Sequence, residues 1–316
     1  MKIQNAQLAN NEPFLRDLQL FCSVARHASF VTAAQESGIS PAHLSKRIAL
    51  LEASLGVKLF QRTTRRVNIT ADGETAFTWA QTLLGNVDDM LQALSGVRNE
   101  PRGALRISTS LRLGREYIAP VMARLRQRYP ALEVWLELLD RRADLIAENF
   151  DIDIRVGEVL EQHLIAHRIT SSYRILCAAP AYIERMGSPR SLAELAQHDC
   201  LLFRERDQRF GLWRLHGSAG EESVKVTGPM ASNHSDVVRQ WAHEGYGIIM
   251  ASVWDVAASL KAGELVQVLP GYRQPADVWA VTTARGGESE KIRVCIEFLK
   301  EALTQGPQTL MIHTTP

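Results

Sequence analysis

The chain has 316 residues, of which 46% are hydrophobic and 22% are charged, and its formal net charge is +1. That length predicts two or three domains of about 100–200 residues each, and the even charge balance gives no global preference for an acidic partner. No apolar run approaches the ~18 residues of a membrane span, and the first residues lack the apolar core of a signal peptide. We therefore expect a cytoplasmic protein, associated with the nucleoid, that binds no membrane.

The four cysteines lie far apart in the sequence. They are Cys22, Cys177, Cys200 and Cys295, and no pair has C-x-x-C spacing. This pattern fits neither a zinc site nor a disulfide framework. We expect core cysteines, no metal and no cofactor.

Basic residues cluster in one short stretch between positions 46 and 66. They are Lys46, Arg47, Lys58, Arg62, Arg65 and Arg66, opposed by Glu52 alone. Such a cluster is typical of a surface that binds phosphate. On charge alone, a solvated charged face is the alternative.

Three short helices are predicted after a flexible segment at residues 1–13. The first runs from Phe14 to about His27, and the second begins after Ser29 and ends before Gly38. The third has Ser40 as its cap and Pro41 at its first position, where a missing N–H costs nothing, and it stops at Gly56.

Two small helices joined by a tight glycine-containing turn form a helix-turn-helix, whose second helix enters the DNA major groove. The residues predicted to face DNA are Ser40, Pro41, Ala42, His43, Ser45, Lys46 and Arg47.

Two short extended segments, 59–62 and 67–69, follow the third helix and predict a small hairpin wing. Arg62, Arg65 and Arg66 lie at its tip, where arginines can contact phosphate or a minor groove. Residues 14–70 are thus predicted to form a winged helix-turn-helix domain that binds double-stranded DNA.

A long linker helix is predicted over residues 71–96, with Thr70 as its cap. Its apolar residues step by three and four along one face: Phe77, Ala80, Leu84, Val87, Leu91 and Leu94. This spacing favours pairing with the same helix of a second copy. The alternative is that the stripe packs on its own domain.

A breaker-rich hinge at 97–104 leads into an α/β pattern over 105–303, followed by a tail at 304–316. Strands are predicted at 105–108, 134–139 and 152–156. Helices are predicted at about 117–129 and, as a short one, at 142–149. Later helices are marked by a capping box of Ser191 with Glu194, by Ser235, by Ser252 with Asp255, and by a final segment at about 289–303. Alternating strands and helices predict mostly parallel sheets in two lobes, about 105–175 with 278–303, and about 176–277.

The sequence resembles the LysR-type transcriptional regulators from about Phe14 to Leu303. The N-terminal half carries the motifs SF-x-x-AA, S-x-x-x-x-S, LE-x-x-LG-x-x-LF-x-R and T-x-x-G. The second half carries LRIS, IAP, RYP, FDIDIRVG, AAPAYI, ELAQHDCLLFRE and GYGI, and the segments CLLFRE and GLWRL are most similar to regulators of malate and tartrate use. The resemblance implies a periplasmic-binding-protein-like effector domain with a small-molecule site between its lobes. It also implies a dimer, and a tetramer built from two dimers, with RNA polymerase as a further partner if the protein is an activator.

Two residues depart from the family pattern. Pro41 stands where many members have Gln, so base readout is expected to shift to His43, Ser45 and Lys46. Arg112 stands where many members have Ser or Thr.

The effector is expected where strand ends meet helix starts. The residues assigned to it are Ser110, Arg112, Gly157, Phe203, Arg204, Asn233 and Ser235. Helix N-termini and two arginines predict a small carboxylate. For Arg112, an ion pair with Glu116 is the alternative.

Two other classes of protein were weighed against a ligand-controlled regulator. An α/β enzyme is disfavoured because the sequence has no G-x-S-x-G, no second histidine after His243-Glu244, and no complete dinucleotide fingerprint. A DNA-binding protein without a ligand is disfavoured because it would not need a two-lobed α/β portion.

Overall fold

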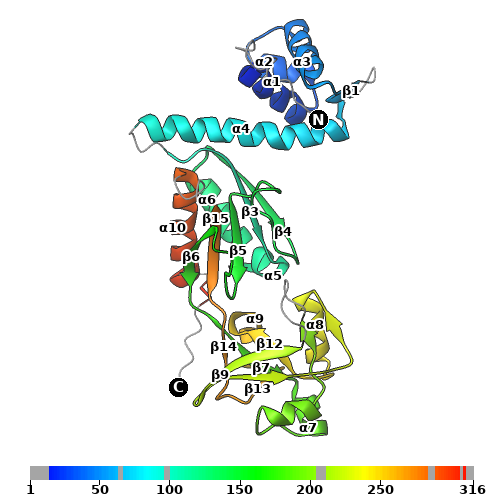
Figure 1. The fold of residues 1–316 in the computed structure, drawn as a ribbon, viewed down its shortest axis with the longest axis vertical. Helices are drawn as coiled ribbons and strands as arrows, with labels where there is room; N and C mark the ends of the chain where they lie inside the picture. The colour runs from blue at the N-terminus through cyan, green and yellow to red at the C-terminus, as the bar shows by residue number, and fades with distance from the viewer. Residues whose placement is uncertain are drawn as a thin grey trace. The chain divides into compact units, whose positions relative to one another are not determined.

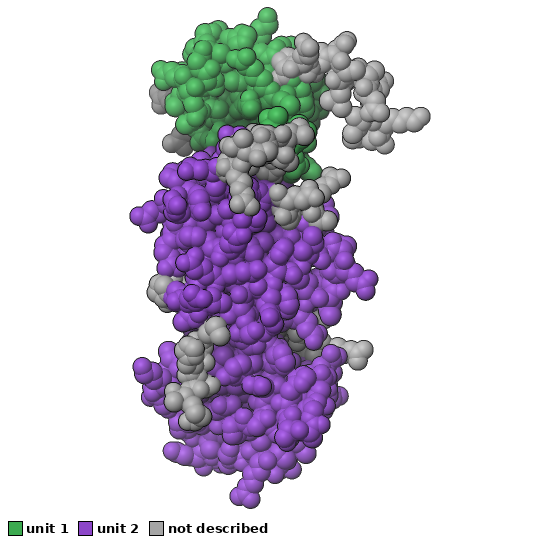
Figure 2. All heavy atoms as spheres, turned by 90° about the vertical axis from the view of Figure 1, so that its left-hand side faces the viewer, with its two compact units in different colours: residues 1–99 green, residues 100–316 purple. Residues whose placement is uncertain are grey.

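In the computed structural model, the chain divides into two compact units, residues 1–99 and 100–316, which Figure 2 colours separately. The structure describes residues 14–62, 67–95, 100–203, 211–283, 289–306 and 309–310, apart from the side chains of residues 62, 88, 89 and 92–95. Among the helices of these ranges, none is both long enough and apolar enough to span a membrane.

The first unit is a winged helix-turn-helix. Its elements are α1 (Phe14–His27), α2 (Phe30–Glu36), α3 (Pro41–Leu55), β1 (Phe60–Arg62), β2 (Val67–Ile69) and α4 (Ala71–Ser95). Strands β1 and β2 pair antiparallel, with Phe60 opposite Ile69, so the predicted hairpin is confirmed. Phe21, Leu44, Ile48 and Leu51 are fully buried between the helices.

The predicted helix caps of this unit are confirmed. Ser29 Oγ accepts the amide of Thr32, and Ser40 Oγ accepts that of His43, each at 3.2 Å. Helix α3 ends at Gly56, whose φ of 73° lies in the left-handed region that glycine enters at little cost. Thr70 Oγ1 accepts the amide of Gly73 at 2.9 Å and starts α4.

The larger lobe of the second unit, lobe I, is a five-stranded sheet in the order β4-β3-β5-β15-β6. Its strands are β3 (Gly103–Thr109), β4 (Leu132–Leu138), β5 (Ile152–Val156), β6 (Leu164–Thr170) and β15 (Val278–Thr283). A helical stretch made of α5 (Leu111–Leu113), the π-helical turn η1 (Gly114–Ile118) and α6 (Ala119–Arg128) packs on it with α10 (Glu290–Thr304) (Figure 1).

Lobe II is built around β7 (Tyr173–Ala178), which pairs with β12 (Ile249–Ser252), β13 (Val266–Val268) and β14 (Gln274–Pro275). Its helical segments are α7 (Pro180–Met186), η2 (Ala193–Gln197), α8 (Ser235–His243) and α9 (Val253–Lys261). Its remaining strands are β8 (Leu202–Phe203) with β11 (Ala231–Ser232), and the hairpin β9 (Leu212–Gly217) with β10 (Gly220–Lys225).

The prediction of mostly parallel sheets is correct for β4, β3 and β5 and for the short pair β8 and β11, and it is wrong for the other strands of the effector unit. Strand β15 runs antiparallel to β5 and β6, and every partner of β7 is antiparallel to it. The reason is the path of the chain, which leaves lobe I at the end of β6 and re-enters it at β15 beside that point, with Val278 opposite Thr170. The connections are residues 171–172 and 276–277, and Ala276 N donates to Ser172 O at 2.8 Å between them.

The predicted helix at 142–149 is a set of turns. Asp144 Oδ1 accepts the amides of Ile146 and Ala147, so the side chain takes backbone donors that a continuing helix would use. Asn149, at a φ of 60°, then ends the turn.

The predicted helix starts in lobe II are only partly correct. Glu194 accepts the amide of Arg190 rather than closing a capping box with Ser191, and the segment is a 3₁₀ turn. Ser235 is the first residue of α8 and His234 is its cap, whereas Ser252 is the cap of α9 but its hydroxyl makes no capping hydrogen bond.

Glu52 joins α3 to the wing. Its Oε1 accepts the amides of Leu59 at 2.9 Å and Phe60 at 3.3 Å, and Oε2 accepts Lys58 Nζ at 2.7 Å. Burial alone raises the pKa of Glu52, but the hydrogen bonds from Lys58, Leu59 and Phe60 outweigh it and hold the pKa below its usual value. A lowered folded pKa gives stability that is complete above the unfolded pKa and is lost as the pH falls through the folded one.

We predict that Glu52→Ala destabilises the first unit by about 1–3 kcal/mol, because two buried amides lose their acceptor. Hydrogen exchange at Leu59 and Phe60 should accelerate, and the acid-induced loss of stability should shrink. Glu74→Ala, an exposed glutamate of α4, is the control and should leave both amides protected. Unchanged exchange at Leu59 and Phe60 in Glu52→Ala would contradict the assignment.

Candidate functional site

The outer face of α3 is open to solvent. Pro41, Ala42, His43 and Lys46 are exposed, and Ser45 is half-buried. Ser40 is occupied as the cap of the helix. The face predicted to meet DNA is therefore accessible at its N-terminal end, where such helices contact base edges.

Arg47 does not belong to that face. Its Nε and Nη2 donate to the two carboxylate oxygens of Asp17, each at 2.6 Å, and Asp17 is buried in α1. A bidentate pair of this kind is strong and directional. Arg47 therefore holds α3 against α1, a structural role that the sequence did not predict.

The wing arginines stay predictions. Arg65 and Arg66 lie outside the described residues, and the side chain of Arg62 is not described.

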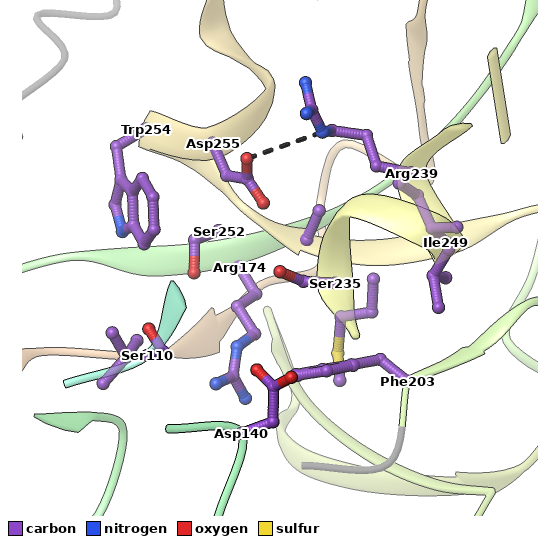
Figure 3. Close-up of a pocket in the computed structure, with 14 residues that line it drawn as sticks. Ser110, Asp140, Arg174, Phe203, Ser235, Arg239, Ile249, Ser252, Trp254 and Asp255 are labelled. Carbon is purple, nitrogen blue, oxygen red and sulfur yellow. Dashed lines mark ion pairs between the residues drawn. The ribbon is translucent and has the colours of Figure 1, made fainter. Parts of the chain in front are cut away.

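The second unit contains a pocket of about 730 Å³, counted to its open mouth, between the two lobes (Figure 3). Ser110, Asp140 and Val156 come from the carboxyl ends of the parallel strands β3, β4 and β5. The other lining residues come from β7, β8, α8, β12 and α9: Arg174, Phe203, Ser235, Val238, Arg239, Ile249, Met250, Ala251, Ser252, Trp254 and Asp255. Its position at strand ends is that of a small-molecule site.

Three helical stretches begin at this pocket, each with a serine. Ser110 precedes α5, Ser235 opens α8 and Ser252 precedes α9. Ser110 and Ser252 make no capping hydrogen bond with their side chains. Their hydroxyl groups and the backbone amides of the helix starts thus offer donors on one cavity.

Arg174 is a buried cation in the wall of the pocket. Arg174 is 6% exposed, and its Nη1 donates to Gln274 Oε1 at 2.7 Å. In Figure 3 its side chain runs from β7 toward the side of the pocket that holds Asp140. Sequence reasoning missed Arg174, although a charged residue inside an apolar strand run (YRILCA) is a usable signal.

Of the seven residues assigned to the effector from sequence, Ser110, Phe203 and Ser235 line the pocket. Gly157 lies behind it: a side chain at this position, where φ is 96°, would lie 3.8 Å from Arg174 Nη2. Asn233 is exposed in the segment before α8, and Arg204 lies outside the described residues.

Arg112 forms ion pairs with carboxylates and is not among the residues that line the pocket. It pairs with Glu116 at 2.9 Å, as the alternative interpretation had it, and also with Asp236 at 3.2 Å and with Asp255. Arg112 acts as an ion-pair partner in the structure, and its assignment as an effector ligand stays a prediction.

Two acids next to the pocket differ in their proton affinity. Burial raises the pKa of Asp255, even though Arg112 and Arg239 act to lower it. Burial also raises the pKa of Asp236, but a hydrogen bond from Arg239 and the charge of Arg112 bring it below its usual value.

The apolar stripe of α4 is divided between two surfaces. Ala80 is buried in the core of the first unit, and Phe77 and Leu84 pack against that core, so these three residues serve their own domain. The cause is α1, whose Phe21 meets Phe77 edge-to-face at 6.2 Å. Val87 is half-buried, Leu91 is exposed, and the side chain of Leu94 is not described.

The four cysteines are buried, and burial raises the pKa of Cys22 to about 11 and those of Cys177 and Cys200 to about 12. Thiols in this state are unreactive at neutral pH. In the described part of the chain, no group of three or more His, Cys, Asp or Glu side chains is placed to hold a metal ion.

Two family models match the chain. The bacterial regulatory helix-turn-helix protein, lysR family, matches residues 15–74, and the LysR substrate binding domain matches residues 98–304. The HTH-type transcriptional regulator DmlR of Escherichia coli K12 is 48% identical, over 92% of this chain and 95% of its own length. The HTH-type transcriptional activator TtdR of the same strain is 41% identical, over 92% and 94%.

Solved structures of full length agree with this match. CrgA, a LysR-type transcriptional regulator from Neisseria meningitidis, has a TM-score of 0.58 at 27% identity and covers 92% of this chain and 99% of its own. The Vibrio cholerae virulence activator AphB has a TM-score of 0.55 at 28% identity, over 90% and 98%.

The fold and these matches define a DNA-binding transcriptional regulator with a two-lobed effector domain, rather than an enzyme. The chain belongs to the LysR family of bacterial transcriptional regulators.

We predict that Lys46→Ala weakens DNA binding and lowers the slope of log K against log salt by about 0.9, because we expect Lys46 to neutralise one phosphate in addition to reading a base. Arg47→Gln should instead leave the slope unchanged and destabilise the first unit by about 2–3 kcal/mol, since Asp17 loses its partner. Salt titrations by fluorescence anisotropy and urea denaturation separate the two effects. A reduced slope in folded Arg47→Gln would contradict the structural role of Arg47.

Proposed function

We propose that the protein binds promoter DNA as a dimer through α3 and the wing, and that a small organic carboxylate in the pocket controls this binding. The observation that supports a carboxylate is the convergence of Arg174 with three helix starts at Ser110, Ser235 and Ser252. Helix N-termini favour anions, and a guanidinium matches the planar shape of a carboxylate.

The buried donors of the pocket support the same ligand class. A guanidinium has five N–H donors, so Arg174 can bind several acceptors at once, with Gln274 among them. Trp254 Nε1 is buried and has no hydrogen-bond acceptor among the described residues. An oxygen-rich ligand would supply acceptors to both side chains.

The acidic residues of the pocket do not oppose this proposal. Asp255 is paired with Arg112, and its carboxylate lies 3.7 Å from Arg239 Nε. Asp140 is exposed at the rim, where water screens its charge. Asp140 can also accept a hydrogen bond from a hydroxyl group, as malate and tartrate would offer.

We predict that malate, tartrate or succinate raises the melting temperature of the protein, and that neutral and cationic compounds of similar size do not. Arg174→Gln should weaken carboxylate binding by about 10- to 100-fold, because a charged hydrogen bond contributes about 1.5–3 kcal/mol. The matched control is Arg168→Gln in the same unit, whose side chain is 60% exposed.

Stabilisation by neutral or cationic compounds alone would overturn the carboxylate assignment. Full operator occupancy with an unchanged footprint across all of these compounds would favour the alternative, a DNA-binding protein without a ligand. If the footprint extends toward the promoter when effector is present, RNA polymerase becomes the expected partner.

The dimer surface that we propose lies on the exposed face of α4. Trp79, Leu83, Met90 and Leu91 are each 44–55% exposed there, unlike the buried Ala80. Large apolar side chains gathered along one helix favour association with the same helix of a second copy. A dimer also suits two half-sites on DNA.

We predict that Leu83→Glu shifts the protein from dimer to monomer in sedimentation velocity, since the new charge would be buried at the helix pair. Leu160→Glu, at a leucine that is 69% exposed in the second unit, is the control and should stay dimeric. A dimeric Leu83→Glu would place the interface elsewhere.

A further inference from the structure

A cluster of six charged side chains joins the two lobes of the effector unit beside the pocket. Arg112, Arg115 and Glu116 come from the α5–η1 stretch of lobe I, and Asp236, Arg239 and Asp255 come from α8 and α9 of lobe II. We call these six residues the clasp. Its three cations and three anions balance.

Arg112 is the centre of the clasp. Its guanidinium pairs with Asp236 at 3.2 Å and with the carboxylate of Asp255, and its Nη2 donates to the backbone oxygen of Asp255 at 3.4 Å. The side chain of Arg112 is only 12% exposed, and that of Asp255 only 9%. Pairs this far removed from water are screened little by salt, and losing one partner leaves a buried charge uncompensated.

The other two arginines of the clasp, Arg115 and Arg239, both pair with Asp236 of lobe II. Arg239 Nη2 lies 3.0 Å from Asp236, and Arg115 Nη2 lies 3.5 Å from the other oxygen of the same carboxylate. Asp236 therefore receives cations from both sides of the cleft.

An aromatic contact accompanies the clasp. The rings of Tyr117 and Trp254 meet edge-to-face at 5.3 Å, and Tyr117 Oη donates to the backbone oxygen of Trp254 at 3.2 Å. Trp254 starts α9 of lobe II, but its side chain belongs to the buried core of lobe I. The first turn of α9 is thus fastened to lobe I by charge, by hydrogen bond and by packing.

The π turn Gly114–Ile118 explains why one helical stretch supplies all of these groups. A π turn widens the helix to i→i+5 hydrogen bonds, and such turns occur often at functional sites. Arg112 and Tyr117 are five residues apart and both reach the start of α9. Gly114 lets the turn lie against the sheet, since a Cβ there would come within 2.1 Å of Leu138 Cδ2.

The clasp is a separate link from the two covalent connections between the lobes. Those connections, residues 171–172 and 276–277, follow β6 and β14, whereas the clasp links the start of the first helical stretch of lobe I to α8 and α9. Two strand-like connections leave a hinge free to bend, so non-covalent contacts must fix the angle between the lobes.

We propose that the clasp fixes the angle between the two lobes in the absence of effector and thereby sets the opening of the pocket. Asp255 and Arg239 of the clasp, and Trp254 next to Asp255 in the chain, also line the pocket (Figure 3). The proposal rests on the proposed function only in treating that pocket as the effector site, because the clasp itself needs no ligand.

The test measures the distance between the lobes without ligand. Spin labels are placed at Gln127→Cys in α6 and Glu184→Cys in α7, both exposed, and pulsed electron resonance reports their separation. The four native cysteines are buried and should label poorly. The full chain is used throughout.

Arg112→Gln is compared with Arg293→Gln. Arg293 also pairs with two carboxylates, Glu290 and Glu297, but both lie in its own helix in lobe I. We expect one narrow distance population in the parent protein and in Arg293→Gln, and a second population or a shifted distance in Arg112→Gln. Asp236→Asn removes one partner and should produce a smaller change of the same kind.

The outcomes are separable. If Arg112→Gln fails to fold, judged by circular dichroism, Asp236→Asn and Tyr117→Phe take its place. The proposal is wrong if the folded variants keep the distance distribution of the parent protein. Because no effector is added, this failure is independent of whether any carboxylate binds.

Discussion

The carboxylate of Asp255 is the group around which the effector unit is organised. A buried charge is tolerated only where opposite charges and donors compensate its loss of water. Asp255 is 9% exposed and finds that compensation in Arg112 from one lobe and Arg239 from the other. Asp255 thus joins Arg112 of lobe I to α9 of lobe II, and Ser252, three residues earlier, lines the same pocket.

The same constraint acts in the DNA-binding unit. Asp17 is buried and takes both hydrogen bonds from Arg47, and Glu52 is buried and takes the amides that begin the wing. Basic residues close together in sequence therefore have different roles. Arg47 fixes helix against helix, whereas Lys46, one position earlier, remains exposed on the face predicted to meet DNA.

Local features of the fold could be predicted from sequence, because their causes lie within a few residues. The caps Ser29, Ser40 and Thr70 each act over three residues, and all three were predicted correctly. The direction of β15 could not be predicted from sequence, since this strand is antiparallel only because the chain returns from lobe II. The helix expected at 142–149 does not form for a local reason: the side chain of Asp144 accepts backbone amides that this helix would use.

Charge pairing was the least predictable part of the site. Arg47 and Asp17 are 30 residues apart, and Arg112 lies 143 residues from Asp255. From sequence, an arginine at a strand end or on a recognition helix is equally suited to a ligand, a phosphate or an acid elsewhere in the chain. Arg112 was expected in the pocket for that reason, while Arg174 and Arg239, two arginines that line it, were missed.

Because Arg174 lines the pocket and Arg112 does not, the pocket discriminates between ligands in a different way from the one expected from sequence. Arg112 is neutralised by three acids, so it contributes rigidity to the walls rather than attraction for an anion. Arg174 donates to the side chain of Gln274, and it lines the same pocket as the exposed Asp140. A ligand that brings a carboxylate to Arg174 and a hydroxyl group to Asp140 satisfies both, whereas a second carboxylate directed at Asp140 would be repelled. Selectivity in this pocket therefore depends on where a ligand carries its charge, as well as on how much it carries.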